Sequence, residues 1–209
     1  FAGGESTQNE AVSVDFDGSG DYLSLESTSD FAYGTGDFTW EMYVKPHAVG
    51  TQFLIKTLTA ASSESKLRLQ SSSGKLMVVY IDGSVSLYSD ALLELNQWSH
   101  IAVTRSSGTV RLFINGIVDK SGSSSKNFEN SNLFIGKDVS SDYFNGEISN
   151  VRLVKGTAVY TSSFRPPTEP LTSITNTVLL CCNNSSTTGK TTGGTITANG
   201  NPTASSDSP

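Results

Sequence analysis

An acidic turn near the start of the chain carries residue types that bind cations. Asp15, Asp17 and Ser19 alternate along it, Gly20 follows, and Glu26 stands at the twelfth position, which is the spacing of a helix-flanked calcium loop. Both flanks, VSVDF and YLSLE, alternate as strands do, so we reject that loop. The open alternatives are a plain β turn and a calcium site of another geometry. The candidate metal ligands are Asp15, Asp17 and Asp21, and calcium is the candidate cofactor.

Two loops have the composition of a sugar-binding surface, on which an aromatic ring stacks against the sugar and polar groups bond its hydroxyls. One loop contains Tyr80 and Asp82, and the other extends from Lys137 to Asn145. The candidate glycan-binding residues are Tyr80, Asp82, Asp138, Asp142, Tyr143 and Asn145. The alternative is that the two tyrosines are ordinary half-buried residues at strand ends.

Patterns of hydrolytic sites are missing from the chain. Glycoside hydrolysis needs two carboxylates across a cleft, but Asp15 and Asp17 run into a turn and Glu41 has no acidic residue two positions away. His47 and His100 are the only histidines, and neither has a partner at metal-ligand spacing. No Gly-x-Ser-x-Gly elbow is present. We therefore expect no catalytic residues and no enzymatic activity.

Strands must position these residues, because alternation with a period of two dominates the chain. Within Trp98–Asp119, two alternating runs flank Ser107-Gly108, and Asn115-Gly116 is the strongest short hairpin signal. The only helical candidate is a short turn at Ser89–Glu94. The runs expected to be strands are 12–16, 22–25, 38–44, 52–56, 66–70, 75–81, 85–88, 98–104, 109–114, 132–136, 144–154, 177–182 and 195–198.

This number of strands predicts an all-β fold, an antiparallel jelly-roll sandwich of two sheets. Residues 1–11 are expected to be an N-terminal extension, 12–200 the sandwich, and 201–209 a C-terminal tail. The run 195–198 is expected to pair with 12–16, with a linker as the alternative. One strand shows its faces clearly: Phe38, Trp40, Met42 and Val44 alternate with Thr39, Glu41, Tyr43 and Lys45.

Net charge and cysteine content limit the classes of partner and the compartment that we expect. The net charge of −6 comes with scattered basic residues, so we expect no nucleic-acid partner, and no apolar run is long enough for membrane insertion. Cys181 and Cys182 are adjacent, so we expect no disulfide, with one thiol buried and one exposed, and assembly in a reducing cytoplasm. The chain opens on Phe1, which is not expected to be a translation start.

Four blocks of the sequence resemble laminin-G-like domains of the concanavalin A-like lectin and glucanase superfamily. They are SVDFDGSGDYLSL from Ser13, GDFTWEMYVKP from Gly36, QWSHIAVTRSSGTVRLFINGIVD from Gln97 and FNGEISNVRLVKGTAVY from Phe144. The resemblance implies the same sandwich and a function that is mostly binding. Where the family often has an acidic pair in its last block, this chain has Glu147, Ser149 and Asn150, which argues against a metal site carried over from the family. The family's glucanases carry a Glu-x-Asp-x-Glu run that is absent here.

The final part, GTAVYTSSFRPPTEPLTSITNTVLL from Gly156, is similar to the form of this domain in tailed-bacteriophage virion proteins. This resemblance implies a non-catalytic module on the virion exterior that adheres to host-surface glycan or to neighbouring virion proteins. We expect a homo-oligomer or many copies on a particle, since multivalency makes weak sugar binding effective. The rival functions are a purely structural capsid-decoration or fibre protein without a ligand, and a glycoside hydrolase.

Overall fold

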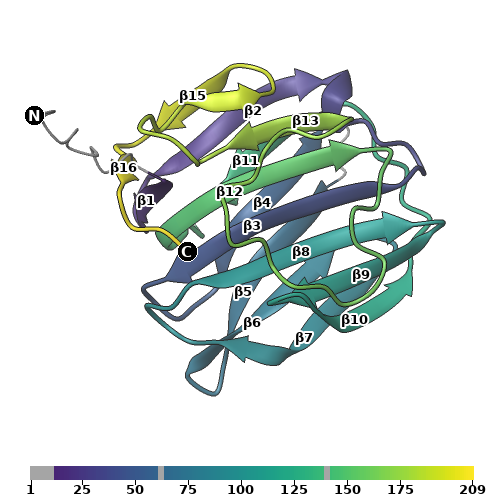
Figure 1. Cartoon of the computed structure of the whole chain (residues 1–209), viewed down its shortest axis with the longest axis horizontal. Coiled ribbons are helices and arrows are strands. Elements are labelled where there is room, and N and C mark those ends of the chain that lie inside the picture. The colour runs from purple at the N-terminus through teal and green to yellow at the C-terminus, as the bar shows by residue number, and fades with distance from the viewer. Residues whose placement is uncertain (1–11, 61–63, 139–141) are drawn as a thin grey trace, which may run out of the picture.

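The alternating runs of the sequence form two antiparallel sheets packed face to face (Figure 1). The computed structural model describes residues 12–60, 64–138 and 142–209, so the expected N-terminal extension, 1–11, lies outside the described residues. The nine-stranded sheet has the order β10-β9-β8-β3-β12-β1-β16, with β13 paired to β12 and β14 to β13. The seven-stranded sheet has the order β15-β2-β11-β4-β5-β6-β7. The predicted all-β sandwich is confirmed.

The strands of the described residues are β1 (Ser13–Asp17), β2 (Tyr22–Thr28), β3 (Phe38–Pro46), β4 (Gln52–Thr59), β5 (Glu64–Ser72), β6 (Lys75–Ile81), β7 (Ser86–Leu93), β8 (Ser99–Ser106), β9 (Thr109–Ile114), β10 (Ile117–Ser123), β11 (Ser131–Ile135), β12 (Asn145–Lys155), β13 (Thr177–Cys181), β14 (Lys190–Thr192), β15 (Ile196–Asn199) and β16 (Thr203–Ser205). A 3-10 turn, Ser29–Phe31, precedes β3. None of the helical structure in the described part of the chain is long and apolar enough to span a membrane.

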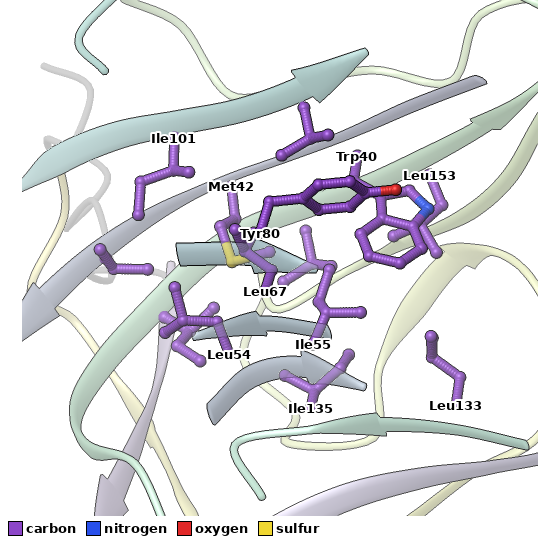
Figure 2. Close-up of a cluster of buried hydrophobic side chains, with 14 of the residues drawn as sticks. Trp40, Met42, Leu54, Ile55, Leu67, Tyr80, Ile101, Leu133, Ile135 and Leu153 are labelled. Atoms are coloured by element: carbon purple, nitrogen blue, oxygen red, sulfur yellow. The ribbon is translucent and has the colours of Figure 1, made fainter. Parts of the chain in front are cut away.

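The core lies between the sheets, as the alternation predicted. Trp40 and Met42 point inward from β3, and Figure 2 shows them facing Leu54 and Tyr80 of the other sheet. The Trp40 and Tyr80 rings meet edge to face, with centroids 6.0 Å apart. Burial of these side chains removes apolar surface from water, which is the main favourable contribution to folding.

Two tight hairpins join β8, β9 and β10, as their turn residues predict. Ser107 and Gly108 have φ of 49° and 78°, and Asn115 and Gly116 have the same values, which is the left-handed pair that a type I′ turn requires. Gly116 is also needed for space, since an added Cβ would lie 2.1 Å from the Phe164 carbonyl oxygen.

The segment 156–176, here called the strap, links β12 to β13 and crosses the outer face of the nine-stranded sheet (Figure 1). Thr39 on β3 donates to the Thr157 carbonyl at 2.9 Å and accepts from the Val159 amide at 2.8 Å. The Phe164 amide donates to the Gly116 carbonyl at 2.8 Å. Because the strap covers this face, the outward-pointing Thr39 is as inaccessible to solvent as the core residues beside it.

Two expectations about the second half of the chain need correction. The expected helical turn at Ser89–Glu94 is wrong, because β7 continues to Leu93 and pairs with β6. The strand expected at 195–198 is present as β15, but it pairs with β2 in the other sheet. β16 pairs with β1 instead, and it lies in the segment expected to be a tail. Tertiary pairing overrides local propensity in both places.

The two cysteines differ from the expected arrangement. Both Cys181 and Cys182 are free and fully buried. The chain turns at Cys182, whose φ is 57°, so its side chain does not continue the strand alternation toward the outside. The two sulfur atoms lie 3.7 Å apart.

Candidate functional site

Three connections between the sheets meet at one end of the sandwich: β1 to β2, β3 to β4, and β11 to β12. Between them lies a surface hollow of about 220 Å³, here called the rim hollow. Its lining residues are Gly18, Ala48, Val49, Gly50, Thr51, Gln52, Asp142, Tyr143 and Asn145. Three predicted glycan-binding residues, Asp142, Tyr143 and Asn145, therefore lie together, beside the turn that follows Asp17.

Asn145 holds the three connections in place. Its amide donates to Gln52 Oε1 at 2.8 Å, and its side-chain Nδ2 donates to the Asp17 carbonyl at 3.1 Å. Its carbonyl accepts from the His47 amide at 2.9 Å. Gly18 has a φ of 80°, and an added Cβ there would lie 2.8 Å from Asn145 Nδ2. The floor of the hollow is thus fixed before any ligand arrives.

The walls of the rim hollow offer groups with unused bonding capacity. Neither the Asp142 carboxylate nor the Thr51 hydroxyl has a hydrogen-bond partner within residues 12–60, 64–138 and 142–209. Val49 is 47% exposed and Tyr143 is half-buried, so apolar and aromatic surface lies beside them. An aromatic face with a few convergent polar groups is the composition of a small-molecule site.

A series of three rings extends from the hollow onto the outer face of the seven-stranded sheet. The Tyr143 and Tyr22 centroids are 6.3 Å apart, and those of Tyr22 and Phe134 are 6.4 Å apart. The Lys137 ammonium lies 4.0 Å from the Tyr22 centroid and 5.6 Å from that of Tyr143. All three rings are half-buried, so each keeps some surface accessible.

Tyr80 and Asp82 do not take part in this site, and both are fully buried. The Tyr80 hydroxyl donates to Asp82 Oδ2 at 3.1 Å, and the same oxygen accepts from Ser124 Oγ at 2.6 Å. Asp82 Oδ1 accepts from the amides of Ser84 and Val85, both at 2.8 Å. The expectation that these two side chains bind glycan is corrected: Asp82 organises the β6–β7 turn, and neither side chain is accessible to a sugar.

Asp138 lies near the site but is committed to an ion pair. Its carboxylate bonds the ammonium of Lys56, which also pairs with Glu64 Oε2 at 2.5 Å. Burial on its own lowers the pKa of Lys56, but the two carboxylates outweigh it and raise the pKa. Residues 139–141, between Asp138 and Asp142, lie outside the described residues.

The residues proposed for calcium do not fit a metal ion in this structure. Asp21 is buried, and its two oxygens accept from the Asn201 amide at 2.6 Å and the Asp17 amide at 3.2 Å. Asp17 Oδ1 accepts from the Ser19 amide at 2.6 Å, as in a β turn. Asp15 lies on the outer face of β1 opposite Glu147. In the described parts of the chain, no three His, Cys, Asp or Glu side chains are grouped to hold a metal.

A cluster of ionisable groups lies beneath the strap. Glu41 accepts from Arg152 Nε at 2.8 Å and from the Tyr160 hydroxyl at 2.9 Å, and His100 Nε2 lies 3.3 Å from it. Burial alone would raise the pKa of Glu41, but the His100 hydrogen bond and the Arg152 charge together hold the pKa below its usual value. Glu41 is 0% exposed and His100 1%, so neither side chain is accessible to a substrate.

A pair of neighbouring carboxylates arises only in the fold. Asp15 and Glu147 are direct cross-strand partners on β1 and β12. Burial raises the pKa of Glu147, against the opposing charges of His47 and Lys45. His47 Nε2 lies 2.8 Å from Glu147 Oε2. Neither Asp15 nor Glu147 lines the rim hollow.

Residues 17–159 match the model of the concanavalin A-like lectin/glucanases superfamily, which is more than half of the chain. The chain belongs to this superfamily. The predicted laminin-G-like relationship is thereby confirmed, and the two-sheet sandwich described above is the fold that it implies.

Solved structures in the superfamily's fold resemble the chain at low sequence identity. A native heptameric SAP-like pentraxin from Limulus polyphemus matches with a TM-score of 0.61 and 14% identity over 96% of this chain and 98% of its own. A putative carbohydrate-binding protein from Bacteroides ovatus matches with a TM-score of 0.54 and 15% identity, over 71% of this chain and 45% of its own. Domain 4 of an extracellular arabinanase from Geobacillus stearothermophilus, in complex with arabinotriose, matches with a TM-score of 0.53 and 20% identity. The match covers 69% of this chain and 70% of that domain. No curated protein matches the sequence.

Sequence reasoning missed Tyr22, Phe134 and Thr51. A signal for the two rings was present, since Tyr22 and Phe134 occupy outward positions of the alternating runs YLSLE and SNLFI, where aromatic residues leave apolar surface exposed. Thr51 carried no signal, because only the meeting of three loops places it beside Tyr143.

Proposed function

We propose that this protein is a non-catalytic glycan-binding module and that its binding site is the rim hollow. The observation that carries the proposal is the half-buried Tyr143 ring flanked by the unpartnered Asp142 carboxylate and Thr51 hydroxyl on connections fixed by Asn145. Sugars require such a combination of a ring face and hydrogen-bonding groups. The superfamily and its carbohydrate-binding structural neighbours support the ligand class.

The non-catalytic part of the proposal rests on the placement of the carboxylates. Glu41 is sealed beneath the strap, and Glu147 is held by His47 and Lys45 away from the rim hollow. Among the described residues that line this hollow, Asp142 carries the one carboxylate, whereas glycoside hydrolysis uses two.

We further propose that the module lies on the exterior of a phage virion in several copies and adheres to host-surface glycan. The resemblance of the segment from Gly156 to tailed-phage virion proteins supports this setting. That segment contains the strap, which covers one sheet face and leaves the rim hollow open at the end of the sandwich.

The binding test uses a glycan array followed by calorimetry. Tyr143→Ala and Thr51→Ala should each weaken binding about tenfold or more, while Tyr88→Ala, which removes an exposed ring from β7, should leave affinity unchanged. Equal effects of all three variants, or release of reducing sugar by the wild-type protein, would contradict the proposal. Absence of binding to any glycan would favour the purely structural function.

The location test uses intact particles that carry the protein. Because both native cysteines are buried, Thr51→Cys at the rim and Ser84→Cys in the β6–β7 turn introduce selectively reactive thiols. The rim thiol should react on whole particles. If it were shielded while the thiol at position 84 reacted, the adhesion role would fall and the structural role would stand.

A further inference from the structure

We infer that the glycan bound is an extended chain, lying on a track from the rim hollow past Tyr22 to a second hollow around Phe134. This inference rests on the proposed function and adds the ligand class: an internal stretch of polysaccharide rather than a single terminal sugar. Three observations carry it, namely the second hollow, its unused polar groups and the rings that join the two hollows.

The second hollow, here called the face hollow, lies on the outer face of the seven-stranded sheet and measures about 190 Å³. Strand pairing places Ser24 of β2 directly between Phe134 of β11 and Thr197 of β15. The lining residues are Ser24, Leu25, Glu26, Asn132, Phe134 and Thr197. The half-buried Phe134 ring is the main apolar surface that points outward here, because Leu25 is buried.

The polar groups around Phe134 are free to bind. The side chains of Glu26, Asn132 and Thr197 have no hydrogen bond or ion pair to any residue that the structure describes. Ser24 Oγ accepts from Asn199 Nδ2 at 3.0 Å, which leaves its own proton to donate. A carboxylate, an amide and two hydroxyls around a ring match the alternating donors and acceptors of a sugar.

A series of neighbouring rings links the two hollows, which share no lining residue. Tyr22 lies between Phe134 and Tyr143, with centroid separations of 6.4 and 6.3 Å. At this junction the Lys137 ammonium lies 4.0 Å from the Tyr22 centroid and forms no ion pair with the described residues. It therefore offers hydrogen-bond donors to a chain that passes between the hollows.

The sizes of the hollows favour a chain over two separate ligands. At about 190 and 220 Å³, each is smaller than the roughly 300 to 1,000 Å³ of a typical small-molecule site. Either hollow alone should bind a sugar weakly. A chain that reaches both makes the second contact intramolecular, which raises affinity by about 10²-fold or more without new groups.

The test is affinity as a function of chain length. Disaccharide to octasaccharide series of arabinan, xylan and β-glucan are titrated against the intact protein. For the series that binds, the octasaccharide should bind about 10²-fold more tightly than the disaccharide. Phe134→Ala should remove this gain while leaving disaccharide binding at the rim unchanged, and Tyr143→Ala should weaken both.

Tyr88→Ala is the matched control, since it removes an exposed ring from the same sheet face away from the track. Asn132→Ala and Thr197→Ala test the face hollow without altering the packing of a ring, and each should reduce only the affinity for long chains. Length-independent affinity, or Phe134→Ala behaving like Tyr88→Ala, would overturn the track while the proposed function stood. No binding to any series would overturn both.

Discussion

Arg152 Nη2 lies 2.6 Å from Glu41 Oε1, in an ion pair that joins β12 to β3 beneath the strap. The Arg152 Nη1 group also donates to the Thr172 carbonyl of the strap at 2.9 Å. Arg152 therefore connects the sheet to the strap that covers it, and the Glu41 side chain of the pair is wholly buried. Loss of this pair should therefore affect the whole fold.

Arg152→Met should lower the free energy of unfolding by about 3 to 5 kcal/mol, because it leaves the Glu41 charge buried without its arginine partner. Lys75→Met, which breaks the exposed pair with Glu94, should cost at most about 1 kcal/mol. Urea unfolding of both variants measures the difference. Similar small losses would mean that the strap opens readily and solvates Glu41.

The same carboxylate should make the protein sensitive to acid. The folded pKa of Glu41 is lowered, so its contribution to stability is complete above the unfolded pKa of about 4.3 and is lost as pH falls through the folded pKa. Urea unfolding at a series of pH values should show stability falling below about pH 4. Glu41→Gln should flatten this slope, whereas Glu169→Gln, on the exposed part of the strap, should keep it.

Trp40→Ala should cost about 3 to 5 kcal/mol, since it empties a fully buried aromatic site. Thr39→Ala should cost about 1 to 3 kcal/mol, because the Val159 amide loses its acceptor beneath the strap. Ser86→Ala, at an exposed outward position of β7, is the neutral control. If Thr39→Ala matched the control, the strap would not seal this face.

Chelation should leave the melting temperature unchanged, because backbone amides already occupy both oxygens of Asp21. A cation that bound only the folded protein would raise its stability by mass action. Thermal melts in chelator and in excess calcium test this. A calcium-dependent rise that Asp17→Asn abolished would restore the metal site.

Neither cysteine should react with a thiol reagent in the native protein at pH 8. Both are fully buried, and the hydrogen bond to Cys182 together with burial raises the pKa of the Cys181 thiol well above its ordinary value. Two thiols should react after unfolding in urea. Rapid reaction of one native thiol would support the arrangement expected from strand alternation.

Much of the fold was predictable because its signals are local. The period of two in FTWEMYV and the turn pairs at Ser107-Gly108 and Asn115-Gly116 each specify a strand face or a hairpin by themselves. The pairing of β15 with β2 was not predictable. Which sheet a short strand joins depends on packing, here the burial of Ile196, and not on the strand's own alternation.

The candidate site was predictable in part. Asp142, Tyr143 and Asn145 lie together at the rim hollow, as their positions in one loop predicted, and their binding of glycan stays a prediction. Tyr80 and Asp82 had the same composition, but a buried turn uses the same residue types to satisfy its own amides. Composition alone does not distinguish a loop that binds a ligand from a loop whose polar side chains bond the backbone amides of its own turn.

By itself, the sequence determined the all-β class, the core face of β3, the tight hairpins and the superfamily, because each depends on the order of neighbouring residues. Only the tertiary structure decided the strap that covers Glu41, the Asp15–Glu147 pair and the meeting of Tyr143 with Tyr22 and Thr51. These contacts join residues that are distant in the chain. Their geometry is set by how two sheets pack and how the connections cross between them, and alternation along one strand carries no information about either.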